Sequence, residues 1–186
     1  MTNSIAIFLA ALVGFIVQSA FFPAMLRLTS GVTGSFLWEG HTVDLALITV
    51  LYLAQYRERS SALIWVALIG ALAGGFGAAW RGSTVASYFL VAFLGSLVSR
   101  YLLLESAVAI VVYVWVASLL EGAIHLHFGH WFARIPSPFE GRTTELIVQA
   151  TLNALVAPLW LLLLAWVDTA TGARRRTNSN RLVLDI

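Results

Sequence analysis

The sequence predicts an all-α protein in which about six helices cross a membrane and pack into one polytopic bundle. The first observation is composition: 60% of the 186 residues are hydrophobic and only 11% are charged, whereas soluble domains carry roughly 25% charged residues. The second is the stretch 43–100, in which breaks of a few charged or small residues separate apolar segments. Breaks this short allow only tight helix hairpins. We therefore expect one bundle over residues 1–172 and a basic cytoplasmic tail over 173–186.

The composition also excludes several kinds of site. The chain has no cysteine, which excludes disulfides, thiolate metal sites and cysteine nucleophiles. Its net charge is only +2, so the sequence gives little support to nucleic-acid binding.

The first predicted span, Ile5–Met25, provides the roughly 20 residues that a bilayer core requires. No basic residue precedes it and no small-residue cleavage site follows, so we interpret it as a retained helix and not as a signal peptide. Gln18 lies inside this span, and we expect it to bond a neighbouring helix. The second span, Val43–Tyr56, is short and has Asp44 at its start. This carboxylate either interacts with the positive end of the helix or is a polar anchor for a partner or a buried contact.

The third and fourth predicted spans, Ser61–Trp80 and Thr84–Val98, contain several small residues, with a short break at Arg81–Ser83 between the spans. Small residues let two helix backbones approach closely where lipid provides no hydrophobic driving force. We expect this seam to pack helices within the chain, and dimerisation of two chains is the alternative. The predicted helix-packing residues are Gly70, Gly74, Gly75 and Gly95.

The fifth predicted span begins at Ser106 and ends between Leu120 and Phe128. Its end carries a cluster of one acid and three histidines, and neutral imidazole is a common metal ligand. The cluster lacks the HExxH order of zinc peptidases and lies among aromatic residues. We interpret it as a polar patch at the membrane interface, with metal or proton chemistry as the alternative, and predict no catalytic residue, metal or cofactor. Its members are Glu121, His125, His127 and His130.

The last predicted span, Thr144–Val167, contains Asn153 and Pro158, and Asp168 is predicted to end it. Proline removes a backbone donor, so we expect a kink whose freed carbonyl is satisfied by neighbours or water.

The arginines suggest an orientation. If the chain has six spans and both termini lie in the cytoplasm, most of the arginines are on the cytoplasmic side, as the positive-inside rule requires. The tail is then expected to rest on anionic membrane lipid. Candidate polar or partner contacts are Gln18, Asp44, Arg57, Arg59, Asn153 and Pro158.

These features together resemble the rod shape-determining protein MreD family of bacterial inner-membrane proteins. Members carry Gln and Pro in the first helix, matched by Gln18 and Pro23, and a Pro-Asp-Leu start of the second, matched by 43–45 with Val43 in place of Pro. The family's third helix is rich in glycine and is followed by a turn and by a fourth helix with a basic end. The corresponding residues here are Gly70, Gly74, Gly82 and Arg100. The closing helix of the family contains Asn and Pro, which Asn153 and Pro158 match.

The resemblance implies a non-enzymatic scaffold of the cell-elongation complex that helps to determine cell shape by positioning peptidoglycan synthesis. Implied partners are a bitopic MreC-like protein, the actin-like MreB, a RodA-like glycosyltransferase and a penicillin-binding protein. The family's bundle is also similar to the substrate-binding subunits of energy-coupling-factor transporters, so uptake of a small molecule such as a vitamin is the alternative function. An intramembrane enzyme using Glu121 and the histidines is a third hypothesis.

Overall fold

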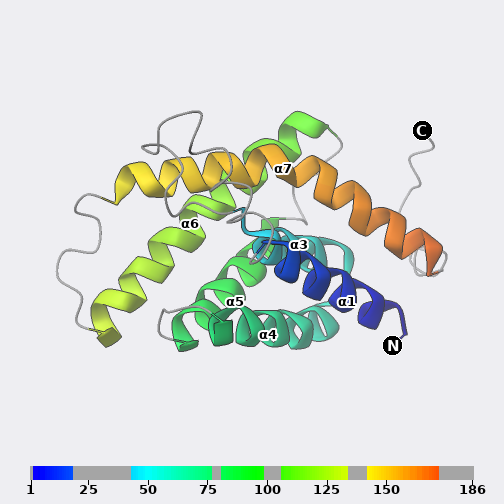
Figure 1. Ribbon diagram of the computed structural model, residues 1–186, viewed down its shortest axis with the longest axis horizontal. Coiled ribbons are helices and arrows are strands. Elements are labelled where there is room, and N and C mark those ends of the chain that lie inside the picture. Colours follow the sequence, from blue (N-terminus) through cyan, green and yellow to red (C-terminus); the bar gives the residue numbers. More distant parts are fainter. Residues whose placement is uncertain (1, 19–42, 77–80, 99–105, 134–141, 172–186) are drawn as a thin grey trace.

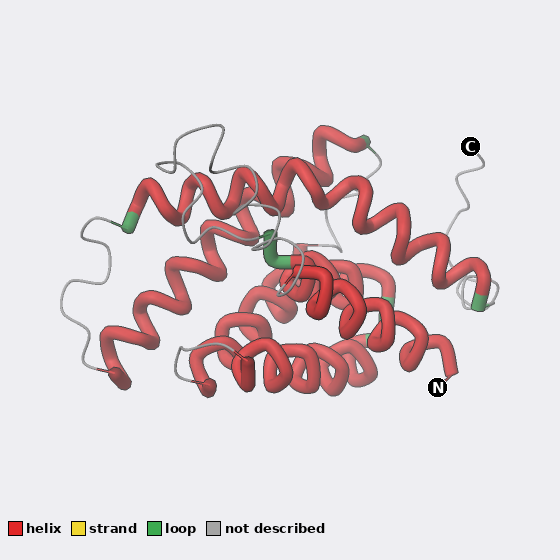
Figure 2. Tube along the Cα trace, in the orientation of Figure 1, coloured by secondary structure: helices red, strands yellow, loops and turns green. Residues whose placement is uncertain are grey.

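The computed structural model describes residues 2–18, 43–76, 81–98, 106–133 and 142–171, and within these ranges the chain is helical apart from short joints and contains no strand (Figures 1 and 2). The all-α prediction is therefore confirmed for this part of the chain. The helices are α1 (Thr2–Ile16), α3 (Leu45–Tyr56), α4 (Arg59–Phe76), α5 (Arg81–Val98), α6 (Ala107–Ala133) and α7 (Thr143–Ala170).

Several helix ends differ from the prediction. Arg81–Ser83 form the first turn of α5, so the predicted break there is wrong. Arginine and serine are tolerated in a first turn, whose N–H groups have no partner inside the helix. At the C-terminal ends, α6 continues beyond Phe128 and α7 continues beyond Asp168. Residues 19–25 of the first predicted span, Pro23 included, lie outside the described residues.

Helix α3 is the core of the molecule. Its residues from Leu45 to Ala54 are all buried, and it contacts α1, α4, α5, α6 and α7. Figure 1 shows it in the middle of the molecule, behind α1. A helix that is apolar all round is expected to be buried on every side, which explains why the shortest predicted span has this position.

Successive helices from α3 to α7 alternate in direction. Along the α5–α6 contact, Ser83 lies against His125, Ser87 against Glu121, and Gly95 against Tyr113. The residue numbers rise on α5 as they fall on α6, so the two helices are antiparallel. Helices α3 and α4 are in contact and joined by only two residues, 57 and 58.

Helices α3 and α7, in contrast, run in the same direction. Hydrogen bonds join Asp44 to Asn153, Thr49 to Trp160, and Tyr52 to Asp168, in rising order on both helices. Four reversals of direction separate α3 from α7 along the chain, so the two helices are expected to be parallel.

Close contacts occur at two of the predicted glycines. A side chain at Gly70 would place its Cβ 3.0 Å from the Cα of Val85 in α5, and one at Gly95 would place it 2.6 Å from the hydroxyl of Tyr113 in α6. Gly74 is buried in α4, and Gly75 lies in the last turn of that helix. Gly70 and Gly95 thus lie at contacts between helices of the same chain.

By length and composition, two helices can cross a membrane: α6 over Ala107–Phe128 and α7 over Thr143–Ala170. The apolar parts of the other four helices are 10–17 residues long, fewer than the roughly 20 residues of a straightforward span.

The outer surface carries apolar side chains at helical spacing. On α7, the side chains of Leu155, Leu159, Leu162 and Trp166 are 65%, 71%, 68% and 70% exposed. Similar residues lie on α1 and α6, for example Val13 and Val108. Polar residues, in contrast, are among those fully buried, such as Thr49, Ser87 and Asn153. Water-soluble monomers rarely expose apolar surface on this scale, so the distribution of polarity fits lipid as the surrounding solvent.

Candidate functional site

The most unusual polar site is the buried start of α3. The first N–H groups of a helix have no partner inside it and must find one elsewhere. The N–H of Leu45 donates to Gln18 Oε1 (2.9 Å), that of Leu47 to Asp44 Oδ1 (2.9 Å), and that of Asp44 itself to Asn153 Oδ1 (2.7 Å). Asp44 is the N-cap residue of α3. Three candidate residues from distant parts of the sequence therefore meet at one helix end.

Further hydrogen bonds hold two of these side chains, those of Asp44 and Asn153, in place. The second oxygen of Asp44 accepts from the hydroxyl of Tyr88 in α5 (2.7 Å). The amide nitrogen of Asn153 donates to Ser118 in α6 (3.1 Å), and Gln149 donates to the Asn153 oxygen (3.3 Å). The resulting network joins the segment after α1 to helices α3, α5, α6 and α7.

A second set of contacts lies between α5 and α6. Ser87 Oγ is 2.8 Å from Glu121 Oε1, and Ser83 Oγ is 3.4 Å from His125 Nδ1. Glu121 and His125 are half-buried, whereas His127 and His130 are exposed. Within the predicted acid–histidine cluster, Glu121 and His125 therefore face α5.

Metal binding was the alternative for that cluster. Within the residues that the structure describes, no three or more His, Cys, Asp or Glu side chains are placed to hold a metal ion. The side chains of Glu121 and His125 each bond a serine hydroxyl of α5, an arrangement that holds two helices together.

The other end of α3 is fixed by a buried ion pair. Arg57 directly follows the helix, and its guanidinium pairs with Asp168 of α7. The second oxygen of Asp168 accepts from the hydroxyl of Tyr52 (2.5 Å). The Asp168 side chain is only 8% exposed and that of Arg57 14%. Asp168 was predicted to end the last span, but it is a buried partner for two residues of the α3 region.

A third connection between α3 and α7 lies between these two ends. The indole N–H of Trp160 donates to Thr49 Oγ1 (2.9 Å), and Thr49 in turn donates to the carbonyl of Leu45 (2.8 Å). Pro158 lies within α7, between Asn153 and Trp160. Helices α3 and α7 are thus joined by polar contacts at both ends and in the middle of α3.

Several of these partners were not identified from the sequence, namely Tyr52, Tyr88, Ser118, Trp160 and Asp168. For the residues on α5 and α6, the spacing in the sequence does contain a signal. Ser118, Glu121 and His125 have the spacing i, i+3, i+7, which places them on one face of α6, and Ser83 and Ser87 share a face of α5.

The remaining candidate residue is Arg59, which is the first residue of α4; its side chain lies outside the described part of the chain. The basic tail and the residues from Arg134 to Gly141 also lie outside it.

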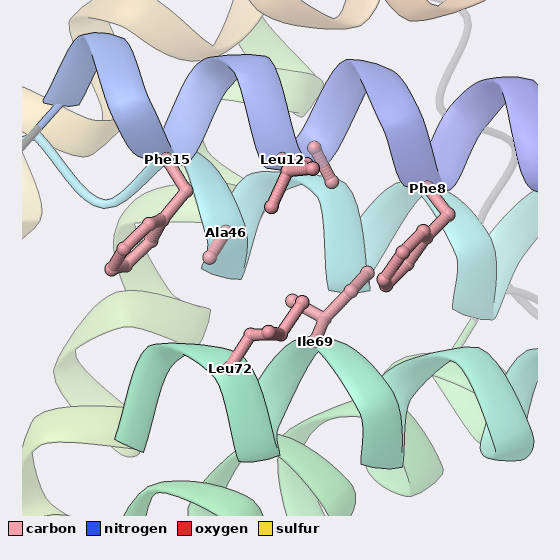
Figure 3. Close-up of a pocket in the computed structure, with 7 residues that line it drawn as sticks. Phe8, Leu12, Phe15, Ala46, Ile69 and Leu72 are labelled. Carbon is pink, nitrogen blue, oxygen red and sulfur yellow. The ribbon is translucent and has the colours of Figure 1, made fainter. Parts of the chain in front are cut away.

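An apolar recess is present between α1, α3 and α4, and Figure 3 shows its lining side chains pointing into it from these three helices. Part of this recess is open to the outside. Cavities that bind small molecules usually combine an apolar lining with a few convergent polar groups. The side chains that line this recess carry no hydrogen-bonding group: they are Phe8, Ala11, Leu12, Phe15, Ala46, Ile69 and Leu72.

Comparison of the chain with models of protein families, with curated proteins and with solved structures finds no match.

Proposed function

We propose that this chain is a six-span scaffold of the bacterial inner membrane that takes part in the cell-elongation complex, with both termini in the cytoplasm. The proposal combines the resemblance to the MreD family with the way in which the interior polar groups are used. Gln18, Asp44 and Asn153, which carry part of the resemblance, each accept a hydrogen bond from a backbone N–H at the start of α3.

This use of polar residues is the observation that carries the proposal. A transporter subunit needs donors and acceptors that are free to bind substrate, and an enzyme needs groups that reach reacting atoms. Here the same groups are bonded to one another and to the backbone. In lipid, where helices gain little from apolar contact, such bonds hold a bundle together. They support a protein whose task is to present a fixed helical surface to partners.

The alternating helix directions support the proposed topology. If residues 2–18 begin on the cytoplasmic side and each helix reverses the last, Asp44 and Asn153 fall in the outer half of the membrane. Arg57 and Asp168 then fall at its cytoplasmic edge, where a basic residue is favoured. The contacts between α3 and α7 agree with this arrangement, because they require the two helices to be parallel.

Affinity purification of the tagged chain from detergent-solubilised membranes tests the proposal. Mass spectrometry should recover elongation proteins of the MreC, MreB, RodA and penicillin-binding classes, and depletion of the chain should convert rod-shaped cells to round ones. Rod-shaped cells that require an added vitamin would instead support an uptake subunit. Loss of function after His125→Ala and His127→Ala, with the same partners absent, would support an enzyme.

A further inference from the structure

Two interior carboxyl groups have no cationic partner among the residues that the structure describes. Asp44 and Glu121 bond to adjacent residues of α5, Tyr88 and Ser87, so both lie at the same turn of that helix. Within the described residues, the third interior carboxylate, Asp168, is paired with Arg57, whereas neither Asp44 nor Glu121 has an ion-pair partner. Two ionised carboxylates placed together in an apolar interior are strongly disfavoured.

The hydrogen bonds at Ser87 indicate which of the two carries a proton. A serine hydroxyl has one proton to donate and two lone pairs that accept. Ser87 Oγ lies 3.1 Å from the carbonyl oxygen of Thr84 and 2.8 Å from Glu121 Oε1. If Glu121 were ionised, both neighbours would be acceptors and would compete for a single proton. If Glu121 is a carboxylic acid, it donates to Ser87 and Ser87 donates to the carbonyl of Thr84, so that neither acceptor competes for the other's proton.

The same reasoning assigns the negative charge to Asp44. Its two oxygens accept from the N–H of Leu47 and from the hydroxyl of Tyr88. An ionised carboxylate is an acceptor only, and the start of a helix stabilises negative charge. A proton on Asp44 would take the place of one of these two donors.

We propose that Glu121 is held as a neutral carboxylic acid that donates a hydrogen bond to Ser87, and that its proton controls the contact between α5 and α6. Loss of the proton leaves Ser87 between two acceptors and places a second negative charge beside Asp44. The α5–α6 contact is therefore sensitive to alkaline pH. This inference rests on the packing of the bundle and does not depend on the proposed scaffold role.

The other groups around Glu121 neither supply nor replace its proton in this arrangement. On α6 itself, His125 bonds to Ser83. From α5 the facing groups are Ser87 and Tyr88, and from α3 the facing group is Asp44. Helix α7 contributes the uncharged amide of Asn153 through Ser118, while its nearest charged residues in sequence, Arg142 and Glu145, are exposed.

Infrared spectroscopy of the purified full-length chain in lipid nanodiscs tests the proposal directly. At neutral pH the wild type should show the carbonyl stretch of a protonated carboxylic acid, and Glu121→Gln should remove it. Glu145→Gln, which changes an exposed acid, should leave it unchanged. A spectrum that Glu121→Gln leaves unaltered would show that Glu121 is ionised and would overturn the proposal.

Thermal unfolding provides the second measurement. From neutral to alkaline pH, the Tm of the wild type should fall by about 3–8 °C, because loss of the Glu121 proton leaves the Ser87 hydroxyl between two acceptors. Glu121→Gln, which keeps a donor toward Ser87, should abolish this part of the fall, and an equal fall in both proteins would contradict the proposal. If that variant does not fold, Ser87→Ala should move the carboxylic acid band to the frequency of a free acid, and an unmoved band would again overturn the assignment.

Discussion

At the scale of single residues, Asp168 shows how much of this bundle depends on exact pairing of buried charge. Its carboxylate bonds both Arg57 and Tyr52, so it fixes α7 against the end of α3. Removing one partner of a buried ion pair leaves an uncompensated charge, whereas replacing both can be nearly neutral. The energetic role of the pair is therefore visible only when single and double variants are compared.

Arg57→Leu should lower the free energy of unfolding by about 3–5 kcal/mol, because Asp168 is left charged and unpaired in the interior. Adding Asp168→Asn should restore most of that loss, since the amide is uncharged and its oxygen still accepts from Tyr52. The unfolding of the protein in mild detergent is monitored by its tryptophan fluorescence. Glu58→Gln, at the exposed neighbouring position, is the matched control and should have little effect. A double variant no more stable than Arg57→Leu would show that the pair does not act in this way.

The residues of this site could be predicted from the sequence only in part. Gln18, Asp44 and Asn153 are detectable because a polar residue inside an apolar run is costly and needs a reason. Their convergence is not detectable, since the bond between Asp44 and Asn153 spans 109 positions and no local pattern encodes it. The pairing of Asp168 was not predicted for the same reason. At the end of an apolar run, the sequence does not distinguish an exposed acid from a buried acid that has a partner.

At the scale of helices, composition and spacing predicted more. The central position of α3 was not predicted, although a helix that is apolar all round is expected to be buried on every side. The close contact of α4 with α5 follows from Gly70, where an added Cβ would lie only 3.0 Å from the Cα of Val85. Helix ends were the weakest predictions, because residues such as Arg81 and Ser83 are compatible with both a turn and the first turn of a helix.

Gly70→Leu should separate α4 from α5 and destabilise the protein by about 1–3 kcal/mol or more. The reason is that the atom nearest to an added Cβ is the backbone Cα of Val85, which cannot rotate away as a side chain end can. Ala71→Leu, at the adjacent exposed position, is the matched control and should be tolerated. Thermal unfolding in detergent measures both, and equal stability of the two variants would argue against a tight seam at Gly70.

At the scale of the whole molecule, an apolar core that contains a few buried polar groups is surrounded by an outer surface that is also rich in apolar side chains. Asn153, Thr49 and Asp168 are buried, while leucine and tryptophan side chains of α7 point outward. Interior hydrogen bonds are most useful where the surroundings offer no competing water, and exposed leucines cost least where the surroundings are hydrocarbon. A lipid environment around the described helices would account for both features.

Cysteine labelling tests this explanation, and the absence of native cysteine means that single cysteines can be introduced without other changes. Leu159 is 71% exposed, and Glu145, near the start of the same helix, is also exposed. In membrane fragments open on both sides, Glu145→Cys should react with a water-soluble maleimide, and Leu159→Cys should react about tenfold more slowly or less. Thiols react as thiolates, and hydrocarbon excludes both the reagent and the thiolate.

Denaturation in sodium dodecyl sulfate should bring the two rates together, which shows that the difference belongs to the native environment and not to the thiols. Val43→Cys, at a position that is buried within the protein, should be unreactive in membranes and in mild detergent alike. Leu159→Cys should stay protected when a detergent micelle replaces the bilayer, because the micelle also covers the apolar surface of α7. If Leu159→Cys reacts as fast as Glu145→Cys in membranes, water surrounds this surface, and the proposed membrane scaffold is wrong.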